Sequence, residues 1–258
     1  MQDKNPAIVT KQLSRNFGDT LAVDHLDLRI ESGTFYGLLG PNGAGKSTTV
    51  AMLTGCLRPT SGTIEILGKK FDPDAPFFKS SMGVVSEQPP LFERLRGPEQ
   101  LVFTGRMYGI ERSEARQRAE DLLALLGLDV HSKTLVADYS RGMKKKLAIA
   151  CALIHAPRVL FFDEPFEGVD ASSADTIRQV LLGLTKRGAT VLLTTHIMEV
   201  AEKLCHKVGI IDKGSIVIET DLAEMKKRGE RLDELFRKVI SETKTLELPG
   251  WLMEKKDS

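Results

Sequence analysis

The stretch of sequence that decides the fold reads Gly40-Pro41-Asn42-Gly43-Ala44-Gly45-Lys46-Ser47-Thr48. It follows the phosphate-binding loop pattern: a glycine, four residues, and then Gly-Lys-Ser. Residues 34–39 form a nearly continuous apolar run, which predicts a buried strand before the loop, and residues 46–55 predict a helix after it. Glycines let several backbone N–H groups converge on phosphate oxygens at the start of that helix. We therefore expect Lys46 to contact the β- and γ-phosphates of a nucleotide and Ser47 to bind Mg²⁺.

A second motif pairs two carboxylates with an apolar strand. Residues 159–162 read Val-Leu-Phe-Phe and are followed directly by Asp163 and Glu164. In open α/β folds ligands bind at the carboxyl edge of the sheet, where such a strand would deliver both side chains. We expect Asp163 to hold Mg²⁺ through water and Glu164 to polarise the attacking water as a general base.

The rest of the chain alternates between strand-like and helix-like segments. The strand-like segments are residues 7–9, 26–30, 62–67, 82–86 and 189–193, with a hairpin at 208–212 and 215–219. The helix-like segments are residues 98–126, 143–155, 172–186 and 221–241. Buried strands that alternate with helices predict an α/β core with a largely parallel sheet.

Composition narrows the class of protein. The chain has 258 residues, 41% of them hydrophobic and 28% charged, with a formal net charge of +1, which excludes wholesale disorder. Its longest unbroken apolar stretch has eight residues, 147–154, whereas a membrane-spanning helix needs roughly 20. We therefore expect no bilayer crossing by this chain, no secretory signal in residues 1–18, and three reduced cysteines.

Taken in order, these motifs resemble the nucleotide-binding subunit of an ATP-binding cassette (ABC) transporter, over about residues 7–219. The resemblance implies an α/β P-loop NTPase (RecA-like) core with an N-terminal antiparallel β subdomain and an inserted α-helical subdomain. It implies an ABC ATPase domain at residues 1–220, with the helical subdomain at about 89–156. Residues 221–258 would then be a C-terminal helical extension and tail, which Trp251 would anchor to the core, with a regulatory or dimer-stabilising role as the alternative to simple packing.

The resemblance also implies roles for single residues. Phe17 would stack on adenine with Val23 beside it, and the ATP phosphates would be bound by Gly40, Pro41, Asn42, Gly43, Ala44, Gly45, Lys46, Ser47 and Thr48. The residues implied in catalysis are Glu164, His196, Gln88 and Lys46, and those implied at Mg²⁺ are Ser47, Gln88 and Asp163. Gln88 takes the Q-loop position, for which the adjacent Glu87 competes, and His196 matches the switch histidine that contacts the γ-phosphate.

Two further motifs match segments that contact the ATP of a partner subunit. Tyr139-Ser140-Arg141-Gly142-Met143 resembles the signature motif, usually Leu-Ser-Gly-Gly-Gln, with Arg141 and Met143 as departures. This variant, like Gly105-Arg106-Met107-Tyr108-Gly109, is similar to the bacterial ABC-2 drug- and lipid-export branch. Asp170 occupies the D-loop and is implied to cross the dimer interface, and Phe166 stands where threonine is more usual.

The implied function is ATP hydrolysis that powers transport, in the export direction. Two copies, or this chain and a close relative, would form a head-to-tail dimer around two MgATP. A separate transmembrane permease would hold the chain at the inner, cytoplasmic face of the membrane. Phe92, Leu95 and Phe103 are candidate permease contacts, unless they are buried within the helical subdomain. The alternative is a soluble ABC ATPase that acts on ribosomes, DNA or protein complexes, although a net charge near zero leads us to expect no nucleic acid partner.

Overall fold

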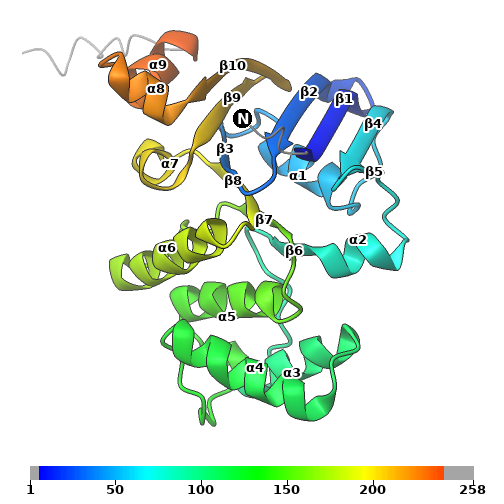
Figure 1. Ribbon diagram of the computed structural model, residues 1–258, viewed down its shortest axis with the longest axis vertical. Helices are drawn as coiled ribbons and strands as arrows, with labels where there is room; N and C mark the ends of the chain where they lie inside the picture. Colours follow the sequence, from blue (N-terminus) through cyan, green and yellow to red (C-terminus); the bar gives the residue numbers. More distant parts are fainter. Residues whose placement is uncertain (1–5, 241–258) are drawn as a thin grey trace, which may run out of the picture.

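The computed structural model describes residues 6–240 and contains two β-sheets (Figure 1). The first is antiparallel, with the order β2-β1-β4-β5. Its strands are β1 (Pro6–Phe17), β2 (Thr20–Glu31), β4 (Ser61–Ile66) and β5 (Lys69–Lys70). The expected trailing segment with Trp251 lies outside the described residues.

The second sheet has the order β10-β9-β3-β8-β7-β6. Strands β3, β6, β7, β8 and β9 are parallel to one another, and β10 is antiparallel to β9. Its strands are β3 (Phe35–Leu39), β6 (Met82–Val85), β7 (Val159–Asp163), β8 (Thr190–Thr195), β9 (Lys207–Asp212) and β10 (Ser215–Asp221). Strand β8 therefore lies between β3, which leads into the glycine-rich loop, and β7, which leads into Asp163 and Glu164.

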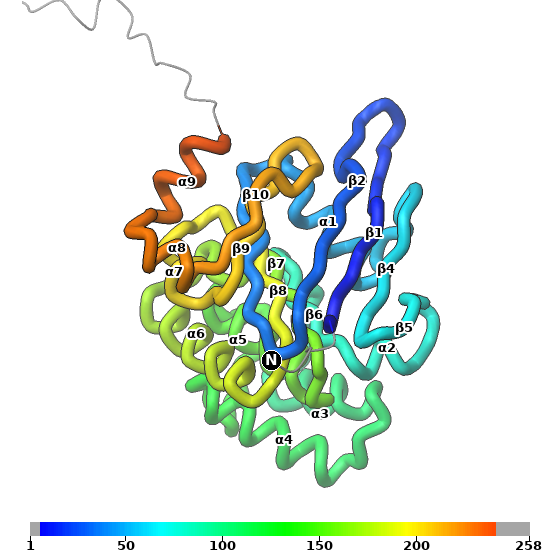
Figure 2. Tube along the Cα trace, turned by 45° about the horizontal axis from the view of Figure 1, so that its top comes forward, coloured from blue at the N-terminus to red at the C-terminus, as the bar shows by residue number. Residues whose placement is uncertain are grey.

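Helices cover the parallel sheet and form a separate group at one end of the molecule. They are α1 (Lys46–Leu53), α2 (Pro76–Ser81), α3 (Gly97–Met107), α4 (Arg112–Leu125), α5 (Arg141–Leu153), α6 (Ala171–Lys186), α7 (Met198–Leu204), α8 (Leu222–Lys227) and α9 (Leu232–Val239), with a 3₁₀ turn at Val136–Asp138. Figures 1 and 2 show α3 and α4 at the end of the molecule opposite β1 and β2. Within residues 6–240, none of the helices has the length and apolar character that a bilayer crossing requires.

The parallel sheet is buried on both faces, so its strands alternate between two hydrophobic clusters. Tyr36, Leu38, Phe161 and Leu192 face the cluster that includes the antiparallel sheet and α1. Their neighbours Phe35, Leu39, Leu160, Phe162, Val191 and Leu193 face the cluster that contains residues of α3 to α6. The α/β class, the parallel core, the antiparallel N-terminal sheet and the inserted helices are thus confirmed.

The structure also differs from the sequence analysis in its short elements. Helices α2 and α7, of six and seven residues, were not predicted. The helical segment expected at 221–241 is two helices, separated by Gly229 with a φ of 72°. All three cysteines are free, and burial raises the pKa of the Cys151 thiol to about 11.

Alanine substitutions at two glycines are expected to change the free energy of unfolding in opposite directions. A Cβ on Gly83 of β6 would lie 2.4 Å from the Ala152 carbonyl oxygen, so Gly83→Ala must push β6 and α5 apart. We expect it to lower the free energy of unfolding by about 1–3 kcal/mol. Gly183 lies exposed in α6, and a Cβ added there would have nothing within 4 Å, so Gly183→Ala should raise that free energy by about 0.5–1 kcal/mol.

Denaturant titration followed by circular dichroism measures both changes. Equal midpoints for Gly83→Ala and the wild type would contradict the close approach of β6 to α5.

Candidate nucleotide and catalytic site

The glycine-rich loop is shaped by close backbone contacts. Gly45 caps α1 with a φ of 103°, in the left-handed region that favours glycine. A Cβ there would lie 2.5 Å from the Ala22 carbonyl oxygen, and one on Gly40 would lie 2.4 Å from the Ile211 carbonyl oxygen. The N–H of Gly214, in the β9–β10 turn, donates to Ala44 O at 3.0 Å. The loop is therefore held between β2 and the β9–β10 hairpin, which leaves its N–H groups at the start of α1 for an anion.

The ammonium group of Lys46 is buried among oxygen atoms. Its Nζ donates to Gly40 O at 2.8 Å and to Pro41 O at 3.1 Å, and lies 3.7 Å from Glu164 Oε1. The side chains of Lys46 and Glu164 are only 6% and 8% exposed. A buried charge is tolerable only when it is paired and hydrogen-bonded, and this ammonium group meets both conditions.

Asp163 lies at the end of β7 and accepts two hydroxyl hydrogen bonds. Ser47 Oγ donates to its Oδ1 at 3.1 Å and Thr194 Oγ1 donates to the same atom at 2.5 Å. A carboxylate beside a serine hydroxyl is a set of hard oxygen ligands, and Mg²⁺ commonly binds one or two carboxylates together with water and substrate phosphates. Within residues 6–240 no three His, Cys, Asp or Glu side chains form a metal cluster, so a cation here would take its remaining ligands from water and phosphate. The donor set fits Mg²⁺.

Glu164 has a left-handed backbone conformation, with a φ of 46°. Its N–H is shared between Thr194 O at 3.3 Å and Thr194 Oγ1 at 3.1 Å, and its carbonyl accepts from Lys145 Nζ at 3.3 Å. Its carboxylate Oε1 lies 3.1 Å from His196 Nδ1. Such a strained backbone persists only where surrounding contacts fix it, as they do here at three groups of the residue.

Lys46, Ser47 and Glu164 line a pocket of about 320 Å³, whereas Asp163 and His196 do not line it. Its lining residues are Ala22, Asn42, Gly43, Gly45, Lys46, Ser47, Thr48, Glu87, Glu164 and Glu167. Glu87 therefore lines the pocket and Gln88 does not. Gln88 is exposed, and its backbone carbonyl accepts from Ser86 Oγ at 3.0 Å.

The two residues expected to contact the adenine of ATP, Phe17 and Val23, differ in exposure. Phe17 is 48% exposed, and the Arg15 guanidinium lies 4.6 Å from the centre of its ring, so a cation–π contact covers one face. Val23 is completely buried in the core beneath the antiparallel sheet and presents no side-chain surface to a ligand. Of the two, Phe17 alone offers a ring surface for stacking.

The signature residues and Asp170 of the D-loop form a second group, and none of these lines the pocket, although Glu167 of the D-loop does. Ser140 caps α5 by accepting from Met143 N at 3.2 Å, and Asp170 caps α6 by accepting from Ser173 N at 2.9 Å. The Ser173 N–H bond lowers the pKa of the Asp170 carboxyl. A Cβ on Gly142 would lie 2.7 Å from Asp170 Oδ2, so the start of α5 packs tightly on the D-loop.

Arg141 follows Ser140 on α5 and lies along the D-loop. Its side chain is 3.5 Å from the position of a Cβ on Gly168, which has a φ of 66°. Phe166 is buried in the core cluster next to the helical region. Arg141 is therefore a neighbour of Gly168, and nothing in the structure explains the phenylalanine at 166.

The sequence analysis did not single out three residues of this site. Thr194 donates to Asp163, Lys145 donates to the Glu164 carbonyl, and Glu167 lines the pocket. Thr194 carried one signal, as a polar residue that ends an apolar strand immediately before Thr195 and His196. No feature of the sequence marked Lys145 as part of the site, because it stands in the run Lys144-Lys145-Lys146, which is typical of a solvated helix face.

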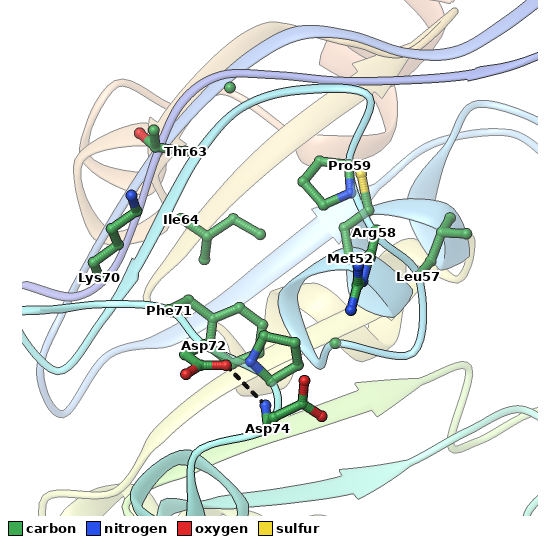
Figure 3. A pocket seen from close by; sticks show the side chains of 13 residues that line it. Met52, Leu57, Arg58, Pro59, Thr63, Ile64, Lys70, Phe71, Asp72 and Asp74 are labelled. Atoms are coloured by element: carbon green, nitrogen blue, oxygen red, sulfur yellow. Dashed lines mark hydrogen bonds between the residues drawn. The ribbon is translucent and has the colours of Figure 1, made fainter.

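Other hollows lie away from this chemistry. Figure 3 shows one of about 370 Å³ near the end of α1, where Met52, Leu57, Ile64 and Phe71 are among the lining residues and Asp74 N donates to Asp72 Oδ1 at 3.0 Å. Another, of about 920 Å³, includes Val84, Met107 and Tyr108 in its lining. Neither contains a residue of the predicted nucleotide site.

Comparison with known proteins agrees with this geometry. The family model of the ABC transporter matches residues 23–167. The daunorubicin/doxorubicin resistance ATP-binding protein of Streptomyces peucetius is 38% identical over 220 residues, which cover 85% of this chain and 67% of that protein. The bacitracin transport ATP-binding protein of Bacillus licheniformis is 36% identical over 225 residues, which cover 87% and 72%.

A solved structure gives the same fold. The dimeric ATP-binding cassette MJ0796, in a post-hydrolysis state with ADP and Pi bound, superposes with a TM-score of 0.77 at 25% identity, covering 83% of this chain and 98% of that one. Sequence and fold agree with the resemblance on which the site residues were assigned. The chain belongs to the ABC transporter family, as one of its ATP-binding, ATP-hydrolysing subunits.

Proposed function

We propose that this chain hydrolyses ATP to power export through a separate membrane-spanning partner. We assign the ATPase domain to residues 1–220, with the helical subdomain at about 89–156, and the extension to 221–258. The observation that carries the proposal is the meeting of five predicted residues at the carboxyl edge of the parallel sheet: Lys46, Ser47, Asp163, Glu164 and His196. Lys46 and His196 contact Glu164, Ser47 contacts Asp163, and Thr194 links Asp163 to Glu164, all within 3.7 Å.

ATP binding uses the loop and Lys46. The ammonium group of Lys46 contacts two neutral loop carbonyls and the Glu164 carboxylate. A triphosphate in the pocket would replace the two carbonyls with anionic phosphate oxygens, which bind an ammonium group more strongly. The N–H groups at the start of α1 would bind the same phosphates. The exposed face of Phe17 would stack on the base, and because every base has a π-face, this contact would discriminate weakly between ATP and GTP.

Mg²⁺ would be held by Ser47 and Asp163, with Gln88 added when the segment around it moves inward. Held by these residues, Mg²⁺ would supply positive charge that neutralises the charge developing on the phosphate oxygens. Thr194 fixes the Asp163 carboxylate for this role, because its hydroxyl occupies one lone pair of Oδ1.

Hydrolysis would use Glu164 as general base. A water oxygen attacks the γ-phosphorus, its proton passes to the Glu164 carboxylate, and the bond from the γ-phosphorus to the bridging oxygen breaks to leave ADP and phosphate. His196, 3.1 Å from the same carboxylate, would contact the γ-phosphate from the β8 side. Lys46 would stabilise the charge of the transition state.

A second copy, or a close relative, would complete the site. Ser140 and Gly142 lie at the N-terminus of α5, away from the pocket of their own chain, where backbone N–H groups and a hydroxyl suit a phosphate from another subunit. The MJ0796 cassette is a dimer, which supports the pairing of two subunits. Arg141 and Met143 would stand beside that phosphate, and Asp170 beside the interface.

The membrane partner would dock on the exposed apolar surface of α3 and its neighbourhood. Phe92 and Phe103 are 53% and 43% exposed and stack edge to face at 5.2 Å, so they are not buried within the helical group, whereas Leu95 is half-buried. Met107, 72% exposed, borders the adjoining groove of about 920 Å³. Two similar proteins are named for daunorubicin/doxorubicin resistance and for bacitracin transport, and these names support export, with the chain at the inner face of the membrane.

Glu164→Gln tests the catalytic assignment. The amide cannot take the proton from water, so we expect ATP hydrolysis to fall by roughly 100-fold or more while ATP binding persists. Because ATP then remains between the subunits, the variant should be dimeric in saturating MgATP and monomeric without nucleotide.

Phosphate release and analytical ultracentrifugation measure these two properties. A Glu164→Gln variant that hydrolyses ATP at the wild-type rate would overturn the role of Glu164. One that stays monomeric in MgATP would overturn the sandwich for the isolated chain.

Met107→Asp tests the membrane partner. Tagged wild-type chain, purified from its native membranes in mild detergent, should bring with it a stoichiometric multi-span protein. A buried interface disfavours an unpaired carboxylate, so Met107→Asp should lose that partner and keep its ATPase activity. Leu125→Asp, at a 57% exposed position of α4, is the matched control and should retain it.

Recovery of the wild-type chain with ribosomes or DNA-associated proteins, and without a membrane protein, would favour the soluble ABC ATPase instead.

A further inference from the structure

Lys145 lies in the middle of α5 with its ammonium group buried beneath the catalytic edge of the sheet. The residue is 5% exposed. Its Nζ donates to the Ser86 carbonyl at 3.2 Å, to the Glu87 carbonyl at 2.6 Å and to the Glu164 carbonyl at 3.3 Å. An ammonium group has three donors, and here each has a carbonyl partner.

These carbonyls belong to two segments that approach the pocket from different strands. Ser86 and Glu87 follow β6, and Glu164 follows β7. Lys145 comes from α5, whose first turn carries the signature residues. One side chain therefore joins the signature helix, the segment that leads to Gln88, and the catalytic glutamate.

Lys145 is costly to bury, which indicates that its contacts matter. Desolvation lowers the pKa of its ammonium group, and the nearby charges of Glu87, Asp163, Glu167 and Glu164 oppose that change. The cost is offset by the three carbonyl contacts and this acidic surrounding. A solvated lysine on the outer face of α5 would have needed none of them.

The Glu164 backbone needs this support. At a φ of 46° a glutamate is strained, and its N–H and side chain are fixed by Thr194, Lys46 and His196. The remaining polar group, the carbonyl, accepts from Lys145 Nζ and from the Glu167 N–H, each at 3.3 Å. Without Lys145 this carbonyl keeps only the uncharged Glu167 bond. The peptide after Glu164 is then held less firmly and can relax toward an ordinary conformation, which would turn the carboxylate away from its present position.

We propose that Lys145 is a positioning residue that sets the Glu164 carboxylate and ties it to the Glu87–Gln88 segment and to α5. The inference rests on the proposed function, because it assumes Glu164 as the base. A displacement of α5 or of the segment after β6 would then move Glu164 as well, because the Lys145 ammonium group contacts both. This coupling requires no contact between Lys145 and ATP.

Lys145→Met tests the proposal, since methionine keeps the unbranched apolar stem and removes all three donors. We expect kcat for ATP hydrolysis to fall roughly tenfold, the loss that one charged hydrogen bond accounts for, while the ATP dissociation constant changes less than about twofold. Lys144→Met is the matched control: Lys144 is the neighbouring residue, contacts Glu93 at 3.4 Å at the surface, and should keep the wild-type kcat.

A double-mutant cycle with Glu164→Gln separates positioning from a general effect on the fold. If Lys145 acts through Glu164, Lys145→Met should not lower the residual single-turnover rate of Glu164→Gln further. A fall in kcat that is equal in both backgrounds would overturn the proposal, as would a Lys145→Met enzyme with the wild-type kcat.

Two provisions keep the test decisive. If Lys145→Met does not fold, Lys145→Leu, which also removes all three donors and keeps an apolar side chain, enters the same cycle under the same criterion. A Glu164→Gln enzyme that hydrolyses ATP at the wild-type rate would show that the proposed base is wrong. A fully active Lys145→Met enzyme, found together with an inactive Glu164→Gln enzyme, would show instead that only the positioning role of Lys145 is wrong.

Discussion

The buried ammonium group of Lys46 is the constraint on which the site depends. A cation that is 6% exposed must be surrounded by acceptors, and the fold supplies two loop carbonyls and the Glu164 carboxylate. These acceptors come from β3 and β7, which are separated in the sheet by β8. Thr194, at the end of β8, is thereby placed to bond both Asp163 and the N–H of Glu164. The order of three parallel strands thus determines which side chains meet.

Helix α5 contacts both the site and several other elements of the molecule. Its first turn presents Ser140 and Gly142 near the D-loop, and its middle sends Lys145 inward to the carbonyls of Glu87 and Glu164. The same helix packs against α3, α4, α6 and β6. A rigid element that contacts both the surface proposed for a second subunit and the carboxylate proposed as the base is well suited to relate subunit closure to chemistry.

Much of the architecture could be predicted because it is encoded locally. The apolar run before Gly40 and the one before Asp163 each form a buried strand, β3 and β7, and the glycine-lysine pair begins α1 as expected. Strands β1 and β2 are longer than predicted, since Gln12 and His25 adopt positive φ and irregular register interrupts the alternation of apolar and polar residues. Short helices such as α2 and α7 depend on their tertiary packing and have too few turns to show a period.

The parts of the site that were not predicted rest on contacts between distant residues. Lys145 and Ser86 are 59 residues apart, and Thr194 and Asp163 are 31 apart. No spacing in the sequence marks such pairs, because they form only when β6, β7, β8 and α5 are assembled. Lysine at 145 and threonine at 194 are ordinary residues for an exposed helix face and a strand, and only their burial reveals their partners.

Complementation between two inactive variants tests the central claim, a site shared between two subunits, most directly. Lys46→Ala disables the phosphate loop and Ser140→Arg disables the signature helix. In a head-to-tail dimer of one copy of each, one site carries both defects and the other carries none. An equal mixture should recover ATPase activity of about a quarter of the wild-type level, since half of the dimers are mixed and each has one intact site. A mixture no more active than the sum of the separate variants would contradict the shared site.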